Sequence, residues 1–388
     1  MSESDTGAKP VRAEEPDGRF SVADHRFMAR ALQLAERGLW TTRPNPRVGC
    51  VIVRDGQIVG EGAHLRAGEA HAEVVALAAA GRRARGATAY VTLEPCSHHG
   101  RTPPCVDALL AAGIGRVVAA MEDPNPRVAG KGLAQLRAAG VEVAAGLMAA
   151  QAEALNPGFV MRMRSGRPYV RCKLAASLDG RTALASGESK WITSSAARRD
   201  VHRLRARSCA IVTGSGTVRA DDPGLTVRDV ELPPHWPGQP LRVVLDSRLR
   251  TSPQAAVVRG EGSVVLFHGV EAAPEAAAAL AAAGARVERV ATASAGGLDL
   301  GAVLASLAAL EVNEALVEAG PTLAGAFLQA GLVDELVVYL APHLMGHEGR
   351  PLLQLAGIST MAERLPLRIL EVRMVGPDLR IRARPEAS

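Results

Sequence analysis

The sequence predicts an α/β fold arranged as two consecutive domains. At 388 residues the chain exceeds the size at which one hydrophobic core usually stops growing. Helical and strand signals alternate through its first half, which is the pattern of a layered α/β domain. The alternation stops at a stretch containing Gly and Pro, residues 165–168, and starts again beyond it. We therefore expect a first domain over residues 21–165 and a second over residues 166–388.

Local patterns predict each element of the first domain. Apolar residues at Phe27, Ala31, Leu34 and Ala35 recur at helical spacing. Residues 54–56 (RDG) read as the turn of a hairpin between two short strands. The expected helices are 23–37, 71–80, 104–112, 132–139 and 149–155. The expected strands are 48–53, 57–59, 89–93, 117–121 and 141–144.

The second half repeats the alternation of strands and helices with no internal repeat of the first. An Ala-rich segment, residues 274–283, is expected to form a surface helix. Residues 232–240 contain four prolines and are expected to form a loop. The expected strands are 169–175, 210–212, 242–245, 263–267, 286–290, 314–317 and 335–340.

Composition narrows the possible partners and the compartment. The net charge is only +5 and 3% of residues are aromatic, so no basic, aromatic platform for nucleic acid stands out. No apolar run reaches the roughly 18 residues of a membrane-spanning helix. Residues 1–20 are polar and contain no apolar signal segment, so we expect a disordered tail there. Five cysteines are too few and odd in number for a disulfide framework, which favours the cytoplasm. We expect a small-molecule substrate, and neither nucleic acid nor a membrane as partner.

Three possible metal ligands occur in a pattern with one carboxylate. His71, Cys96 and Cys105 offer one imidazole and two thiolates, and a catalytic zinc needs three protein ligands with one position open for water. A thiolate at the start of a helix is stabilised by the helix dipole. Zinc lowers the pKa of its bound water toward neutrality. Glu73 is the candidate general acid/base, and its spacing from His71 places both residues at the mouth of a helix.

Two alternatives remain for these residues. The cysteines and His71 could be buried and inert, or His98 or His99 could complete a closed structural site with no open position. Glu73 is in the right place to carry protons, which argues against a structural site that has no open position for water. Cys50 lies near the start of a strand and is expected to be a core thiol.

The His-x-Glu and Pro-Cys…Cys pattern resembles the zinc nucleobase deaminases. It departs from their common Pro-Cys-x-x-Cys spacing, because eight residues separate Cys96 from Cys105. Residues 92–105 (TLEPCSHHGRTPPC) instead resemble the deaminase half of the bacterial bifunctional riboflavin-biosynthesis enzymes. Three further segments match that family: 44–49 (PNPRVG), 68–73 (GEAHAE) and 123–126 (DPNP). The resemblance implies a cytidine-deaminase-like α/β/α first domain in which Asn45 binds the pyrimidine; the alternative for Asn45 is a turn residue.

The second half carries no metal pattern, and its clue is a glycine turn after a strand. Residues 318–325 (EAGPTLAG) follow the expected strand 314–317 and open a helix, where backbone N–H groups can hold a phosphate. The turn is not the Gly-x-Gly-x-x-Gly fingerprint, so a Rossmann domain is not supported. A plain strand-to-helix turn would show the same glycines.

The resemblance to the riboflavin family continues through the second half and implies a dihydrofolate-reductase-like α/β domain that binds NADPH. The matching segments are 173–183, 186–193, 214–223 and 225–228. The implied NADPH-binding residues are Ala175, Trp191, Thr217, Asp221, Ser247, Gly320, Pro321, Thr322, Leu323, Ala324 and Gly325. The implied residues for the phosphorylated substrate are Ser189, Arg205, Leu225, Arg228 and Glu318.

Residue chemistry supports part of this assignment. Arginine binds phosphate through a two-pronged guanidinium, which suits Arg205 and Arg228, and the flat ring of Trp191 suits a cofactor ring. The alternatives are a solvated helix face for Arg205 and core packing for Trp191. Asp179 and Glu318 are the candidates for assisting the opening of the ribose ring.

The resemblance implies a two-step enzyme with zinc and NADPH as cofactors. Zinc hydroxide removes the 2-amino group of 2,5-diamino-6-ribosylamino-4(3H)-pyrimidinone 5′-phosphate, and NADPH then reduces the ribosyl group to give 5-amino-6-(5-phosphoribitylamino)uracil. The family also implies a homodimer formed through the second domain. The competing hypotheses are a deaminase acting on nucleic acid and a zinc-stabilised nucleotide-binding protein.

Overall fold

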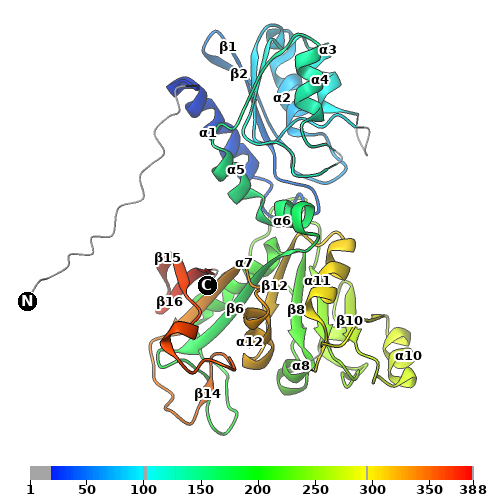
Figure 1. Ribbon diagram of the computed structural model, residues 1–388, viewed down its shortest axis with the longest axis vertical. Helices are drawn as coiled ribbons and strands as arrows, with labels where there is room; N and C mark the ends of the chain where they lie inside the picture. Colours follow the sequence, from blue (N-terminus) through cyan, green and yellow to red (C-terminus); the bar gives the residue numbers. More distant parts are fainter. Residues whose placement is uncertain (1–18, 99–102, 127, 294–295, 387–388) are drawn as a thin grey trace, which may run out of the picture.

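The computed structural model describes residues 19–98, 103–126, 128–293 and 296–386. Figure 1 shows two sheets with their helices, one above and one below helix α6 (Pro157–Ser165). The expected α/β class is therefore confirmed. Residues 1–18 of the expected tail lie outside the described residues.

The first sheet has five strands in the order β2-β1-β3-β4-β5. Strands β1 and β2 form the predicted hairpin, β1 and β3 are antiparallel, and β3, β4 and β5 are parallel. The strands are β1 Gly49–Arg54, β2 Gln57–Ala63, β3 Thr88–Val91, β4 Arg116–Ala119 and β5 Glu142–Ala145.

Helices cover both faces of this sheet, as expected for an α/β/α domain (Figure 1). Helices α1 and α5 lie on one face and α2, α3 and α4 on the other. Helix α1 begins at a capping box, in which the Ser21 hydroxyl and the Asp24 carboxylate each bind the other's backbone N–H. The helices are α1 Val22–Glu36, α2 Ala72–Ala80, α3 Cys105–Ala111, α4 Lys131–Ala138 and α5 Ala149–Leu155, with a 3₁₀ turn at Gly81–Ala84.

Two glycines of β2 allow α2 to lie directly on the strand. A Cβ at Gly60 would lie 2.2 Å from the Ala76 carbonyl oxygen, and one at Gly62 would lie 2.1 Å from the Ala72 carbonyl oxygen. Only glycine permits so close an approach of two backbones. The position of the N-terminus of α2, and of His71 just before it, therefore depends on these two residues.

The second sheet has nine strands in the order β11-β10-β9-β8-β12-β6-β13-β16-β15. The strands from β11 to β13 are parallel, and β16 and β15 add to the sheet as antiparallel neighbours. The strands are β6 Tyr169–Ser177, β8 Ala210–Gly214, β9 Leu241–Leu245, β10 Val264–His268, β11 Arg286–Arg289, β12 Glu314–Glu318, β13 Glu335–Ala341, β15 Leu367–Val375 and β16 Asp378–Pro385; a small ladder joins β7 Arg181–Ala183 and β14 Arg350–Pro351.

The helices of this half connect the parallel strands. The C-terminal hairpin of β15 and β16 was not predicted from the sequence, nor were β7 and β14. The helices are α7 Ser195–Arg207, α8 Ser215–Asp221, α9 Ala256–Arg259, α10 Pro274–Ala282, α11 Leu300–Ala309 and α12 Pro321–Gln329, with a 3₁₀ turn at Met361–Glu363.

Each sheet has its own hydrophobic core. The buried residues around the first sheet run from Phe27 to Val160, and those around the second begin at Val170. The predicted boundary at residues 165 and 166 falls between these two sets, where α6 ends. Within the part of the chain that is described, no helix has the length and apolar character needed to cross a membrane.

Candidate active sites

The three candidate zinc ligands lie together beside the first sheet. His71 is the N-cap of α2, as predicted, Cys96 lies in the loop after β3, and Cys105 is the first residue of α3. Their ligand atoms all lie within 4.8 Å of one another. His71 Nδ1 is 3.1 Å from Cys105 Sγ and 3.5 Å from Cys96 Sγ. Ligand atoms around a tetrahedral zinc are roughly 3.4 to 3.8 Å apart. The observed spacings are close to that range, and one imidazole with two thiolates is a donor set that suits zinc.

Glu73 lies in the first turn of α2, directly beside this cluster, and is 3% exposed. Burial raises the pKa of Glu73 to about 7, although a backbone hydrogen bond and the His71 ring oppose the rise. A carboxyl group with a pKa near neutrality can both accept and release a proton during a reaction. The site therefore combines a metal-binding set with a proton carrier.

The remaining candidate ligands do not join the cluster. Cys50 lies within β1 and is fully buried, and burial raises the pKa of its thiol, so it is a core residue as predicted. Among the described residues the cluster consists of His71, Cys96 and Cys105, without His98. The alternative fourth ligand His99 lies outside the described residues.

The loop that carries Cys96 is held by the buried carboxylate of Glu94. One oxygen of Glu94 accepts hydrogen bonds from the backbone N–H groups of Gly132 at 2.8 Å and Leu133 at 3.2 Å. The other accepts from Asp123 at 3.0 Å and Gly130 at 2.9 Å. Glu94 therefore ties the zinc-ligand loop to the segment after β4 and to the start of α4.

Asn45 lies next to the metal cluster through a histidine. The Asn45 side-chain amide is 3.1 Å from His64 Nε2, and His64 Nδ1 is 3.1 Å from the Ala70 carbonyl oxygen. The His64 ring in turn stacks edge-on against His71, with ring centroids 5.3 Å apart. The structure therefore places the sequence-predicted Asn45 beside the zinc cluster.

A second site is a cavity of about 2100 Å³ in the other half of the chain. It lies where the parallel neighbours β8 and β12 end and helices α8 and α12 begin. The crevice outside the carboxyl ends of parallel strands is the usual place for ligands in α/β sheets. The volume exceeds the roughly 300 to 1,000 Å³ of an ordinary ligand pocket, which leaves room for a cofactor and a substrate together.

Most of the residues predicted for this half line the cavity. Ala324 and Gly325 do not line it, because Ala324 is fully buried in the core and Gly325 packs directly against the Gln354 backbone. Asp179 does not line the cavity either; its carboxylate accepts hydrogen bonds from the backbone N–H groups of Met345 and Gly346. The predicted residues that line the cavity are Ala175, Ser189, Trp191, Arg205, Thr217, Asp221, Leu225, Arg228, Ser247, Glu318, Gly320, Pro321, Thr322 and Leu323.

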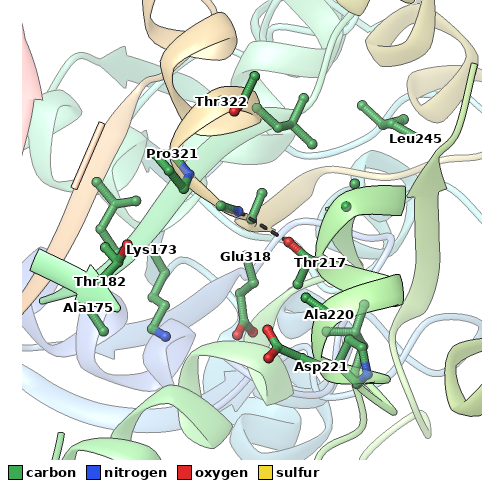
Figure 2. A pocket seen from close by; sticks show the side chains of 18 of the residues that line it. Lys173, Ala175, Thr182, Thr217, Ala220, Asp221, Leu245, Glu318, Pro321 and Thr322 are labelled. Carbon is green, nitrogen blue, oxygen red and sulfur yellow. Dashed lines mark hydrogen bonds between the residues drawn. The ribbon is translucent and has the colours of Figure 1, made fainter. Parts of the chain in front are cut away.

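Charged residues meet at the floor of the cavity. The Glu318 carboxylate binds the Arg205 guanidinium at two points, and Arg205 also donates to the Thr226 carbonyl oxygen at 2.9 Å. Figure 2 shows the side chains of Lys173, Glu318 and Asp221 directed into this space. Burial lowers the pKa of Lys173, and the Glu318 charge opposes the shift. The sequence prediction gave Lys173 no role, although a lysine inside a mostly apolar strand was an available signal.

The rim of the cavity is cationic and partly aromatic. Trp191 is 69% exposed, and the Arg198 guanidinium lies 4.5 Å from the centre of its ring, so the alternative of core packing for Trp191 is wrong. The Arg228 side chain is 57% exposed, lies 3.7 Å from the Asp229 carboxylate and donates to the Thr226 hydroxyl at 3.3 Å. Arg228 is therefore a largely exposed cation at the rim, whereas the Arg205 guanidinium is bound at two points by Glu318.

Comparison with known proteins defines the class to which these two sites belong. The family model for the cytidine and deoxycytidylate deaminase zinc-binding region matches residues 21–121. The family model for the RibD C-terminal domain matches residues 168–381. The chain is therefore a deaminase with a zinc-binding region joined to a reductase domain.

Whole-chain relatives identify the family. The riboflavin biosynthesis protein RibD of Escherichia coli is 55% identical over 369 residues, which cover 92% of this chain and 98% of that protein. The RibD of Haemophilus influenzae is 47% identical over 95% of this chain and 99% of its own length. The solved structure of Acinetobacter baumannii RibD, form 1, has a TM-score of 0.87 at 46% identity, covering 94% of this chain and 99% of that one. The chain belongs to the RibD family of riboflavin biosynthesis proteins.

Membership of this family gives the chain its two activities. It is a bifunctional enzyme of riboflavin biosynthesis, a zinc-dependent deaminase followed by an NADPH-dependent reductase. The expected cytidine-deaminase-like fold of the first half and reductase fold of the second are confirmed.

Proposed function

We propose that the substrate is 2,5-diamino-6-ribosylamino-4(3H)-pyrimidinone 5′-phosphate and that deamination precedes reduction. The support is a relative of known structure from Thermotoga maritima, described as a diaminohydroxyphosphoribosylaminopyrimidine deaminase/5-amino-6-(5-phosphoribosylamino)uracil reductase. Its TM-score with this chain is 0.79 at 33% identity, over 94% of this chain and 99% of that one. The first step exchanges the 2-amino group for oxygen from water and releases ammonia. The second converts the ribosyl group to a ribityl chain and gives 5-amino-6-(5-phosphoribitylamino)uracil.

In the first step His71, Cys96 and Cys105 hold zinc, and Glu73 carries the proton. Zinc bound by these residues would supply an activated water molecule. Glu73 takes a proton from that water and gives one to the departing amino group, a role supported by its burial and its place beside the ligands. Asn45 binds and orients the pyrimidine.

In the second step the cavity holds NADPH and the deaminated substrate. NADPH would supply the hydride, so the protein's task is to orient the two molecules. Arg228 takes the substrate phosphate at the exposed rim, and Ser189, Arg205, Leu225 and Glu318 complete that binding site. NADPH is held by Ala175, Trp191, Thr217, Asp221, Ser247 and the segment from Gly320 to Leu323, where helix α12 begins. Ala324 and Gly325 are buried within that helix and support the segment without lining the cavity.

The enzyme works as a homodimer joined through the reductase domain. Strand β15 is the edge of the nine-stranded sheet and exposes Ile369, Val372 and Met374 to between 54% and 60%. An edge strand with exposed apolar side chains is a template for pairing with another strand. Ile369→Lys should convert a dimer into monomers in analytical ultracentrifugation. A wild-type monomer at micromolar concentration would contradict the assignment.

The compartment is the cytoplasm. All five cysteines are free thiols in the structure, and two of them belong to the zinc cluster. Thiols remain reduced in the cytoplasm, whereas an oxidising compartment would favour their loss as ligands.

The test follows ammonia release and NADPH oxidation together on the diaminopyrimidinone substrate. Ammonia should appear without NADPH, and NADPH should be consumed only after deamination. Glu73→Gln should keep zinc but lower ammonia release by roughly 100-fold or more. Glu61→Gln is the matched control, because that surface carboxylate pairs with Arg30 and does not touch the cluster. Ammonia release that survives Glu73→Gln unchanged would overturn the role of Glu73.

A further inference from the structure

Residues of the reductase domain bind the loop that carries Asn45, residues 43–47, which we call the Asn45 loop. The Asn313 side-chain amide donates to the Pro44 carbonyl oxygen at 2.6 Å. The Arg47 guanidinium binds the Glu314 carboxylate at 2.7 Å, and the two side chains are 9% and 3% exposed. The second domain therefore binds the residue directly before Asn45 and the residue two positions after it.

The start of the Asn45 loop is anchored to the same domain. The Arg43 guanidinium donates to the carbonyl oxygens of Ser208 and Gly238. It also lies over the Trp236 ring, 5.6 Å from its centre. The proline-containing segment 232–240 therefore closes over the first residue of the loop.

The deaminase domain holds the other end of the loop, where the Arg47 guanidinium also donates to the Leu155 carbonyl oxygen at 2.5 Å. Asn156 accepts the Arg47 backbone N–H at 2.7 Å and donates to the Arg47 carbonyl oxygen at 2.9 Å. It fixes the end of the loop, while the bonds that hold Arg43 and Pro44 come from the other domain. The Asn45 side chain itself reaches inward to His64, beside zinc ligand His71.

The anchor in the reductase domain is a buried cluster of paired charges. Glu314, the first residue of β12, also binds the Arg171 guanidinium and is 3.4 Å from Arg207. Burial opposes ionisation of Glu314, but the charges of Arg47, Arg171 and Arg207 hold its pKa well below the ordinary range. The carboxylate therefore stays charged and bonded inside the structure, and breaking such a buried pair from one side is costly.

We propose that Asn313 and Glu314 are positioning residues for deamination: from the reductase domain they hold the Asn45 loop so that Asn45 faces the substrate beside the zinc ligands. The proposal rests on the proposed substrate-binding role of Asn45. It implies that the first reaction uses residues of the domain that performs the second.

The test measures the steady-state kinetics of ammonia release by the full-length, zinc-loaded chain on the diaminopyrimidinone substrate. Asn313→Ala removes only the bond to Pro44. Arg47→Met keeps the apolar stem of the side chain but removes the bond to Glu314 together with the bond to the Leu155 carbonyl oxygen. Each should raise KM for deamination by roughly five- to tenfold, the value of one lost hydrogen bond at a binding site. The kcat of deamination and the zinc content should stay near wild type, because neither residue touches zinc or Glu73.

Three further variants complete the test. Arg164→Met is the matched control for Arg47→Met, because it removes an exposed pair with Glu153 on nearby helices and should leave KM unchanged. Arg47→Lys can still reach Glu314 and should restore part of the wild-type KM. Asn45→Ala should raise KM at least as much as the two loop variants.

The outcomes distinguish failure of the positioning role from failure of the proposed role of Asn45 or of the proposed substrate. Wild-type KM in both Asn313→Ala and Arg47→Met, with Asn45→Ala impaired, would overturn the positioning role alone. An Asn45→Ala chain with wild-type KM would overturn it together with the proposed role of Asn45. Absence of ammonia from the wild-type enzyme would instead reject the proposed substrate. If Arg47→Met does not fold, the Asn313→Ala variant alone tests the positioning role, because this substitution leaves every buried ion pair intact.

Discussion

Arg205 and Glu318 form a two-point ion pair in the reductase cavity, with Nε to Oε1 at 2.6 Å and Nη2 to Oε2 at 2.9 Å. Burial opposes ionisation of Glu318, yet the charge of Arg205, its hydrogen bonds and Lys173 lower the pKa of Glu318 to about 2. The carboxylate is therefore ionised at neutral pH. It can hold a substrate hydroxyl or the Lys173 ammonium in place, but in this arrangement it has no proton to give.

Loss of the Glu318 charge should stop the second reaction and spare the first. Glu318→Gln leaves Arg205 buried without its counter-charge and removes the acceptor beside Lys173. We expect NADPH oxidation with the deaminated substrate to fall by roughly 100-fold or more, while ammonia release stays at the wild-type rate. Wild-type NADPH oxidation in this variant would show that the reductase reaction does not depend on the Glu318 charge.

His202 should make the reductase domain sensitive to acid. It lies on α7 and accepts the Arg228 backbone N–H at its Nδ1, 3.3 Å away. Burial, with the charges of Arg205 and Arg228, lowers its pKa from 6.5 to about 4. The unfolded chain then binds the proton more tightly than the folded chain, so stability falls as the pH drops from about 6.5 toward 4.

The measurement compares the melting temperatures of the wild type and His202→Gln at about pH 7.5 and about pH 5. Glutamine can still accept the Arg228 N–H but does not titrate. The wild type should lose more than the variant on acidification. Equal losses would mean that His202 does not contribute to the pH dependence.

Glu94 should be needed for the stability of the zinc-ligand loop. The Glu94 carboxylate accepts hydrogen bonds from four backbone N–H groups. In Glu94→Gln the new NH₂ group is a donor and faces two of these N–H groups, which lose their acceptor. Leaving buried donors without acceptors should cost about 2 to 3 kcal/mol in the free energy of unfolding. Denaturant unfolding with zinc content measured alongside is the check, and Glu122→Gln on the exposed side of the neighbouring loop is the control. A Glu94→Gln chain as stable as this control would contradict the prediction.

Gly62→Ala should displace helix α2. The added methyl would lie 2.1 Å from the Ala72 carbonyl oxygen and 2.6 Å from the Ala76 nitrogen. We expect a loss of about 1 to 3 kcal/mol in stability and weaker zinc retention, because the shift carries His71 with it. Gly216→Ala adds a methyl that meets nothing within 4 Å and should leave zinc retention unchanged. Tight zinc binding in Gly62→Ala during competition with a chelator would show that α2 tolerates the methyl.

The sequence allowed correct prediction of the features that local chemistry determines. The period of apolar residues located α1, and the RDG turn located the hairpin of β1 and β2. The spacing of His71 and Glu73 placed both at the start of a helix, where the structure has them. The zinc cluster was predictable because its three ligand types and the carboxylate are themselves the signal.

Features that depend on distant partners were missed. Strand β16 buries Asp378 and Arg380, which reverses the usual alternation. Arg380 is paired there with Asp200 and Glu371, each at 2.8 Å. The partner of Arg205 is a carboxylate 113 residues away in the sequence. A run of arginines on α7 therefore read equally well as a solvated face, although Arg205 is only 12% exposed.

Strand β12 has a consequence for how this chain can vary through evolution. Its first residue, Glu314, holds Arg47 of the deaminase half, and its last, Glu318, lies in the reductase cavity. Side chains two and four positions apart on a strand share one face, so a single inserted or deleted residue would turn one carboxylate away from its partner. The residues between Glu314 and Glu318 can change in type, as in any buried strand. A change of length would damage both enzymes at once, so selection on either activity should keep this strand at a constant length.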